Sequence, residues 1–284
     1  MTSLLRPCLR RLLFLAAACA GIGLPLAAAS APTGNFDVHA YGATGDGKTI
    51  DTAAINQAID AAAAAGGGTV YFSAGTYASY SIHLKSNVAL YLDIGATILA
   101  ADPPAEDASG GYDDPEPNQW DKYQDFGHTH WHNSLIWGEN LENIAILGPG
   151  RIFGKGLSRG QARKDPLPGE PRPPAPAVTT PPVARTAGQG GSGGAVTPET
   201  PFGYPSARDT LAAGVGNKSI ALKNCRNVIF RDFTIYHGGH FAILATGVDN
   251  LTVDNLKIDT NRDGIDLDCC RNTHVSNCSV NSPR

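Results

Sequence analysis

The sequence predicts an all-β fold, a parallel β-helix (solenoid) with a short N-terminal capping helix. The first observation is an internal repeat near the end of the chain, where Asn227, Asn250 and Asn272 recur at intervals of 23 and 22 residues. The second is that apolar residues alternate between these Asn corners, as they do when every other side chain of a strand points inward. A leucine-rich repeat has a similar period, but its recurrent leucines and intervening helices are absent from the sequence.

The repeat extends over most positions of a coil. The matching apolar residues are Val228, Leu251 and Thr273 one place after each asparagine, Phe230, Val253 and Val275 at three places, and Ile235, Ile258 and Val280 at eight. Asparagine accepts the left-handed backbone conformation of a corner, and stacked amides can form a ladder. Each coil then covers the apolar face of the next one, so no coil has a core of its own.

The segment before the coils predicts a capping helix. Asp51 or Thr52 can cap its first turn, and Ile55, Ala58, Ile59 and Ala62 fall on one face at helical spacing. Three glycines at positions 66–68 end this helix, and residues 69–72 and 88–92 are expected to be strands.

An export signal is expected at residues 1–30. Arg6, Arg10 and Arg11 precede a short apolar run, and small residues around Ala29 offer a cleavage site. Glycine and proline interrupt the run, which makes it too short to span a membrane. We expect a secreted or periplasmic protein without a membrane contact.

The remainder, residues 35–284, is expected to form one incomplete β-helix domain. Pro, Gly, Ala and Thr dominate residues 155–216, a composition that buries too little apolar surface to offset the entropy of ordering. We expect this segment to be a flexible insertion between coils, either a loop over a groove or a tolerated insert.

Charge and cysteine content narrow the functional classes. A net charge of −4 argues against a nucleic-acid partner but leaves an acidic polymer possible as substrate. The cysteines after the signal lack zinc-ligand spacing. Cys225 and Cys270 share a coil position two coils apart, a separation of about 9.6 Å, which is too far for a disulfide. We expect single thiols.

The candidate catalytic segment is residues 261–268, Asn-Arg-Asp-Gly-Ile-Asp-Leu-Asp. Asp266 and Asp268 point the same way on a strand, and Asp263 lies beside Gly264, where the backbone bends and ligands can approach. A calcium loop is an alternative, although the twelve-residue EF-hand order is absent. A purely structural corner is another. Counting from the Asn corners stacks His240, Asp263 and position 285 in one column.

The chain resembles glycoside hydrolase family 28, the polygalacturonase and rhamnogalacturonan hydrolase family. The motif that carries the resemblance is Asn261-x-Asp263-Gly264-Ile265-Asp266, which is similar to the family's first catalytic signature. Less specific similarities are found at residues 41–47, 67–77, 86–88, 95–97 and 148–152. The resemblance implies a right-handed parallel β-helix that hydrolyses galacturonan-type polysaccharides with inversion, without a metal or another cofactor.

The resemblance also implies roles for individual residues. Asp263 would activate water, while the general acid belongs to an Asp-Asp pair that the family carries further along the chain. That pair, a Gly-His-Gly motif and a basic Arg-x-Lys clamp would lie beyond residue 284, so the chain is expected to be inactive by itself. Arg262 replaces the usual threonine and would alter contacts beside the cleavage point. Asn261, Arg262 and Asp266 are expected to bind substrate.

A second cluster, His128-Thr129-His130-Trp131-His132, offers further candidates. Alternate histidines on a strand could bind a metal, but a groove wall for sugar stacking through Trp131 is our working hypothesis. A loop packed only for stability is the alternative. His237 and His240 are expected to bind substrate, because His240 is placed one coil from Asp263.

Two other functional classes stay open. One is a polysaccharide lyase on the same fold, which would need bound calcium and a catalytic Arg or Lys. The other is a non-catalytic glycan-binding or adhesin β-helix. In each case we expect a monomer with a galacturonan or rhamnogalacturonan ligand.

Overall fold

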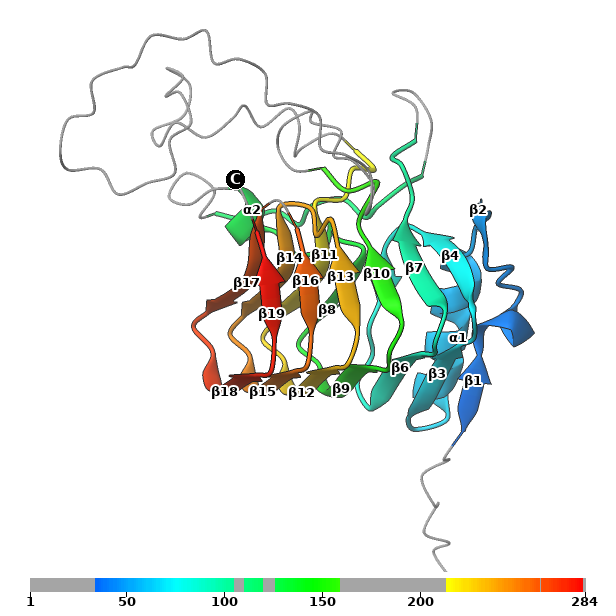
Figure 1. Cartoon of the computed structure of the whole chain (residues 1–284), viewed down its shortest axis with the longest axis horizontal. Helices are drawn as coiled ribbons and strands as arrows, with labels where there is room; N and C mark the ends of the chain where they lie inside the picture. The colour runs from blue at the N-terminus through cyan, green and yellow to red at the C-terminus, as the bar shows by residue number, and fades with distance from the viewer. Residues whose placement is uncertain (1–33, 105–109, 120–125, 159–212, 261, 283–284) are drawn as a thin grey trace, which may run out of the picture. The chain divides into compact units, whose positions relative to one another are not determined.

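The computed structural model describes residues 34–104, 110–119, 126–158, 213–260 and 262–282 (Figure 1). The expected export signal and most of the expected insertion lie outside these residues. Within them the chain forms a right-handed parallel β-helix, as the sequence predicted. Three sheets run along the coils, and the strand pairings in each sheet are parallel.

The sheets, which we call A, B and C, each take one strand from a coil. Sheet A contains β1 (Asn35–Asp37), β3 (Gly68–Phe72), β6 (Val88–Leu92), β9 (Glu142–Leu147), β12 (Arg226–Arg231), β15 (Asp249–Asp254) and β18 (Arg271–Ser276). Sheet B contains β2 (Asp46–Ile50), β4 (Gly75–Ser79), β7 (Ala96–Ala100), β10 (Arg151–Phe153), β13 (Thr234–Tyr236), β16 (Lys257–Asp259) and β19 (Ser279–Asn281). Sheet C contains β5 (Ile82–His83), β8 (Ile136–Glu139), β11 (Lys218–Lys223), β14 (Phe241–Thr246) and β17 (Asp263–Asp268).

Apolar side chains stack in columns inside the coils. Phe230 lies opposite Ile146 on one side and Val253 on the other, and all three are fully buried. The expected pairing of Val228 with Leu251 is also present. A fully buried side chain of this size contributes about 1.5–3 kcal/mol, so coil-on-coil burial is the main source of stability.

An asparagine ladder runs along one corner of the coils, as expected. Asn143 donates from Nδ2 to Asn87 Oδ1 (2.8 Å), Asn227 to Asn143 (2.9 Å) and Asn250 to Asn227 (3.0 Å). The φ angles of these four residues lie between 56° and 65°, in the left-handed region. Asn272 has the same conformation but donates to Asp249 Oδ1 instead, so the ladder changes partner there.

Helix α1 (Thr52–Ala64) covers the first coils, after a 3-10 turn, η1 (Val38–Tyr41). Its buried face contains the expected apolar residues, Ile55, Ala58, Ile59 and Ala62. The expected side-chain cap is wrong for Asp51, whose carboxylate instead accepts from the backbone amides of Thr44 (2.7 Å) and Gly45 (3.1 Å). In the described ranges no helix is long and apolar enough to cross a membrane.

The four cysteines of the described residues are free thiols. Cys225 and Cys270 precede β12 and β18, which are separated by β15, so the expected two-coil spacing is confirmed. Cys225 is buried, and this burial raises the pKa of its thiol.

Candidate active site on the outer face of sheet C

The predicted site residues of β17 lie on sheet C. Ile243 of β14 packs into the core, whereas Leu244 packs with Trp131 in a second cluster on the outer face. Asp266 pairs with Leu244 in the next strand, and Asp268 pairs with Thr246. The two carboxylates therefore share the outer face, as the alternation predicted.

A covering segment, residues 110–119, is attached to this face by two carboxylates. Asp113 Oδ2 accepts from Trp137 Nε1 at 2.7 Å and lies 2.7 Å from His83 Nε2. Burial opposes ionisation of Asp113, but these two hydrogen bonds outweigh it and lower the pKa of the carboxyl. Glu116 accepts from the backbone amides of Trp131 (3.0 Å) and His132 (3.1 Å).

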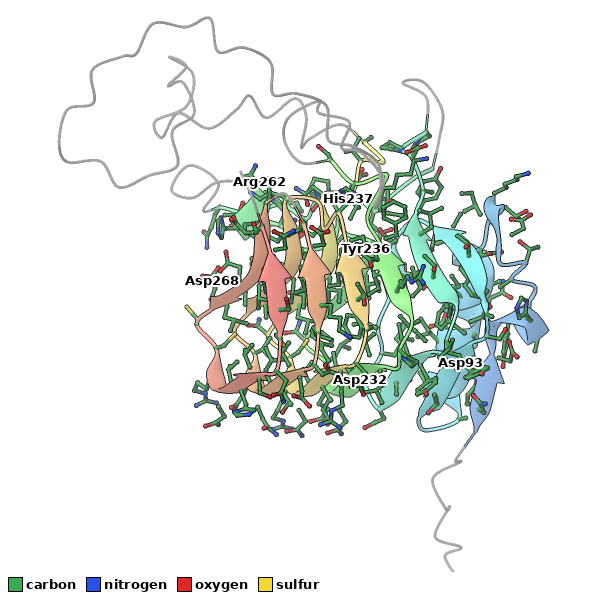
Figure 2. All side chains as sticks on the ribbon, in the orientation of Figure 1. Asp93, Asp232, Tyr236, His237, Arg262 and Asp268 are labelled. Carbon is green, nitrogen blue, oxygen red and sulfur yellow. The ribbon has the colours of Figure 1, made fainter. Side chains whose placement is uncertain are left out.

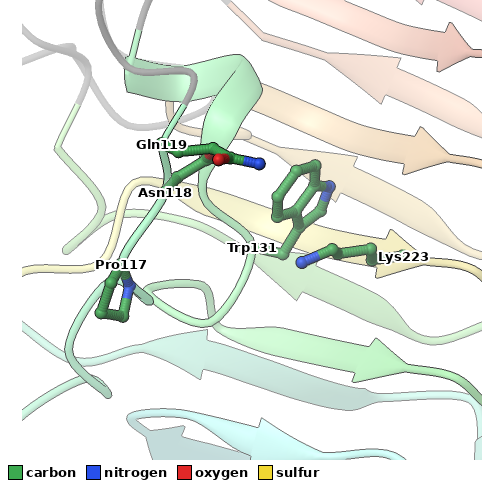
Figure 3. Close-up of a pocket in the computed structure, with 5 residues that line it drawn as sticks. All are labelled: Pro117, Asn118, Gln119, Trp131 and Lys223. Carbon is green, nitrogen blue, oxygen red and sulfur yellow. The ribbon is translucent and has the colours of Figure 1, made fainter.

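A pocket of about 410 Å³ lies between this segment and sheet C (Figure 3). Its lining consists of Pro117, Asn118, Gln119, Trp131 and Lys223. Trp131 is only 6% exposed, its Nε1 donates to Thr246 Oγ1 at 3.1 Å, and the Lys223 ammonium lies 4.4 Å from the centre of its ring. Trp131 therefore offers a limited part of its surface to a ligand.

Lys223 and its acidic neighbours form an ion-pair network beside this pocket. Lys223 Nζ lies 3.1 Å from Glu139 Oε1 and 4.0 Å from Glu116 Oε1. Glu139 also lies 2.9 Å from His132 Nε2, whose ring stacks on Trp137. Burial opposes the charge of Glu139, but the hydrogen bonds from His132 and Lys223 outweigh it and lower the pKa of this carboxyl.

The expectation that the histidines of residues 128–132 alternate on a strand is wrong. His128 belongs to a short helix, α2 (Phe126–Thr129), because the segment turns over the sheet instead of pairing with it. His132 contacts Glu139, His130 lies 3.0 Å from Thr129 Oγ1, and His128 reaches Asp266. The three rings therefore have different partners and do not form one metal site.

The predicted stacking of Asp263 on His240 is wrong by one residue. Asp263 pairs with Phe241. The turn between β13 and β14 contains residues 237–240, whereas the next coil has only residues 260–262 between β16 and β17. Counting from the Asn corners missed this difference because it assumes turns of constant length. Phe241 packs with the outer-face cluster, and its ring centroid is 4.6 Å from that of His128.

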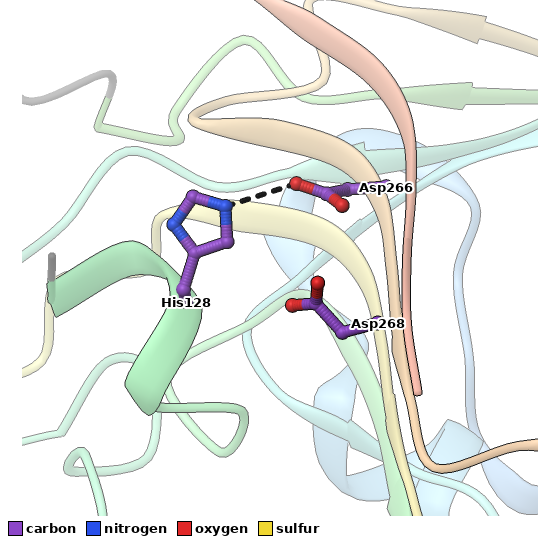
Figure 4. Close-up of side chains that lie close together, drawn as sticks. All are labelled: His128, Asp266 and Asp268. Atoms are coloured by element: carbon purple, nitrogen blue, oxygen red, sulfur yellow. Dashed lines mark hydrogen bonds and ion pairs between the residues drawn. The ribbon is translucent and has the colours of Figure 1, made fainter. Parts of the chain in front are cut away.

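An acidic strand edge therefore lies next to His128. His128 Nε2 is 3.0 Å from Asp266 Oδ2, and Asp268 projects beside them (Figure 4). The next residue after Asp263, Gly264, is explained by packing, because a Cβ there would lie 2.5 Å from Val280 Cγ1.

The remaining candidates lie in the turns between sheets B and C. Figure 2 shows His237 and Arg262 along the same edge of the coils. The His237 ring lies 5.5 Å from Phe153 of sheet B, and His240 is 8% exposed and lies 4.6 Å from the Phe241 ring. Asn261 lies outside the described residues.

Sequence reasoning missed the polar column Glu139, Lys223, Thr246 and Asp268, and the two carboxylates of the covering segment. The column could have been found, because the pairings of β8, β11, β14 and β17 repeat its spacing. The contacts of Asp113 and Glu116 had no such signal, since they join a loop to strands that are distant in the sequence.

Two family models match the chain. One is described as rhamnogalacturonase A/epimerase, pectate lyase-like, and covers residues 35–133; the other is described as right handed beta helix region and covers residues 207–283. Both agree with the observed coils.

Among curated relatives, the exo-poly-alpha-D-galacturonosidase of Dickeya chrysanthemi is 36% identical over 141 residues, which cover 46% of this chain and 21% of that protein. A mannuronan C5-epimerase of Azotobacter vinelandii is 46% identical over 74 residues, 23% of this chain and 4% of that protein. The chain therefore matches only a small part of the length of either relative.

Solved structures agree on the fold. The exopolygalacturonase of Thermotoga maritima has a TM-score of 0.59 at 19% identity, with 88% of this chain and 53% of that chain covered. The family 28 exopolygalacturonase of Yersinia enterocolitica has a TM-score of 0.58 at 24% identity, with 86% and 43% covered. The chain has the right-handed β-helix fold of family 28 glycoside hydrolases, so the resemblance noted in the sequence is confirmed at the level of the fold.

Proposed function

We propose that this chain carries part of the active site of an exported hydrolase that cleaves pectin-type polysaccharides, with Asp263 as the carboxylate that activates water. The observation that carries the proposal is the placement of β17, whose first residue is Asp263 and whose two other aspartates lie on the outer face of sheet C. The partial identity to an exo-poly-alpha-D-galacturonosidase supports this substrate class.

The substrate would lie across sheet C beside the covering segment. There Trp131 and Lys223 line the pocket, and a lysine is the kind of group that can hold the carboxylate of a uronic acid. Asp266 belongs to the same face, while His237, His240, Arg262 and Asn261 belong to the turns that precede it. We propose that these residues contact the sugar units on either side of the bond that is cleaved.

Hydrolysis with inversion needs a second carboxyl group that protonates the leaving oxygen. The family resemblance assigns it to an acidic pair after residue 284, so we expect the chain by itself to release no reducing ends. Adjacent coils are only about 4.8 Å apart, nearer to the separation of retaining enzymes. Inversion therefore requires the second carboxyl to project away from Asp263.

A second candidate is a uronate lyase or epimerase, which the segment shared with a mannuronan C5-epimerase favours. Such an enzyme removes a proton from the sugar ring instead of adding water to the glycosidic bond. Its lyase product contains an unsaturated uronate that absorbs in the ultraviolet. A reducing-end assay read together with that absorbance separates hydrolysis from elimination.

The first test is binding by the chain itself. Affinity electrophoresis in gels that contain polygalacturonate, alginate or dextran measures retardation by each polymer. We expect retardation by polygalacturonate and none by dextran, whose uncharged rings give Lys223 no partner. Equal migration in all gels would refute a pectin-binding face, and stronger retardation by alginate would favour the second candidate.

The second test is catalytic. In a protein that carries this chain together with a following acidic pair, Asp263→Asn should lower kcat by about 100- to 10,000-fold, the usual contribution of a general base. The matched control is Asp60→Asn, because Asp60 is 64% exposed and its ion pair is with Lys85, outside sheet C. Equal turnover in the two variants would exclude Asp263 as the base.

A further inference from the structure

One imidazole and two carboxylates converge on the outer face of sheet C. His128 comes from α2, and Asp266 and Asp268 come from β17. Their ligating atoms all lie within 4.8 Å of one another, although 138 residues separate His128 from Asp266 (Figure 4). Packing of the covering helix against the strand creates this arrangement.

Electrostatics do not favour two carboxylates side by side. Asp266 and Asp268 project from the same face of one strand, and like charges at this distance repel each other. The residues that pair with them in the adjacent strand are Leu244 and Thr246, which are uncharged. A single protonated imidazole can balance only one of the two negative charges.

We propose that His128, Asp266 and Asp268 form a binding site for a divalent transition-metal ion of the Zn²⁺ class. An imidazole nitrogen with two carboxylate oxygens suits such an ion, whereas Ca²⁺ is held by oxygen ligands alone. Three protein ligands leave at least one coordination position for another molecule. The His128 and Asp266 side chains are 24% and 27% exposed, so the site is shielded but open to a ligand.

The site gives the acidic strand a way to hold an acidic polymer, and this part of the inference rests on the proposed function. Asp263, Asp266 and Asp268 together repel a polyuronate. A bound metal ion reverses the local charge, and its open position can accept a sugar carboxylate. The inference departs from the metal-free chemistry that the family resemblance implies.

Metal binding is tested on the untagged, metal-free chain without polysaccharide. Calorimetry with Zn²⁺ and absorption spectroscopy with Co²⁺ should show one site, with d–d bands typical of nitrogen and oxygen ligands. His128→Gln and Asp268→Asn should each weaken Zn²⁺ binding at least tenfold, because loss of a ligand exceeds the 10- to 100-fold effect of losing its supporting group. Ca²⁺ should compete poorly with Zn²⁺.

The matched control is Asp113→Asn, which removes the carboxylate of another His–Asp pair, His83 with Asp113 at 2.7 Å. This variant should bind Zn²⁺ like the unchanged chain. Absence of binding, equal loss in the control, or unchanged affinity in His128→Gln would overturn the site. If His128→Gln does not fold, as judged by circular dichroism, the His128 ring resonances of the unchanged chain serve instead, and they must shift on Zn²⁺ addition.

A separate measurement distinguishes this inference from the proposed function. Polygalacturonate affinity is compared with and without Zn²⁺ in the unchanged chain and in Asp268→Asn. Zn²⁺ should strengthen binding at least tenfold in the former only. Zn²⁺ binding without any polygalacturonate binding would leave the metal site standing and refute the proposed substrate. Polygalacturonate binding that ignores Zn²⁺ would refute the role of the metal in holding it.

Discussion

Asn250 offers a direct measure of what the corner ladder contributes. Its φ is 59°, and its Nδ2 donates to Asn227 Oδ1 at 3.0 Å. Alanine in a left-handed conformation costs about 1–2 kcal/mol, and loss of one hydrogen bond costs about 0.5–1.5 kcal/mol. Only one ladder bond is lost, because Asn272 donates to Asp249 instead. Asn250→Ala should therefore destabilise the chain by about 1.5–3.5 kcal/mol.

Asn250→Gly separates the two contributions. Glycine adopts this conformation without strain, so the variant loses the hydrogen bond and about 0.4–1 kcal/mol through the greater freedom of its unfolded chain. We expect Asn250→Gly to be the more stable variant by roughly 1 kcal/mol, or about 2–4 °C in Tm for a domain of this size.

The assay is thermal unfolding followed by circular dichroism at 218 nm, roughly the minimum of β-structure, with the unchanged chain beside both variants. If Asn250→Gly unfolds at the same temperature as Asn250→Ala, or below it, backbone strain is not the reason for asparagine at this corner. If both variants equal the unchanged chain, the ladder contributes nothing to stability.

Two further predictions concern thiol reactivity and acid sensitivity. Cys269 is exposed and should react with a thiol reagent in the native state, whereas Cys225 should react only on unfolding, because burial raises its pKa; equal rates by mass spectrometry would contradict this. The pKa of Glu139 lies below its ordinary value of 4.5 in the folded chain, so the folded state binds fewer protons than the unfolded state. Its contribution should be full above about pH 4.5 and be lost as pH falls through the lower folded pKa. The Tm difference from Glu139→Gln should therefore shrink in acid, and a constant difference between pH 7 and pH 3 would refute the role of His132 and Lys223 in lowering the pKa.

The repeat made most of the fold predictable from sequence. A residue such as Phe230 contacts only the equivalent residues of adjacent coils, so a period of 22 or 23 residues specifies its neighbours. Asparagine at positions 227 and 250 marks the corners for a local reason, the left-handed backbone conformation. The position of α1 was predictable because its apolar face follows helical spacing.

Tertiary structure decided the site. Asp263 was identified from its motif, but its neighbour is Phe241 and not His240, because one turn is a residue shorter than the turn before it. The contact of His128 with Asp266 depends on how a covering helix packs over a distant strand. The sequence by itself determined the coil, its corners and the acidic strand, since these depend on local or periodic interactions. Turn length and loop packing determined which side chains meet, because no periodic pattern links a loop to the strand it covers.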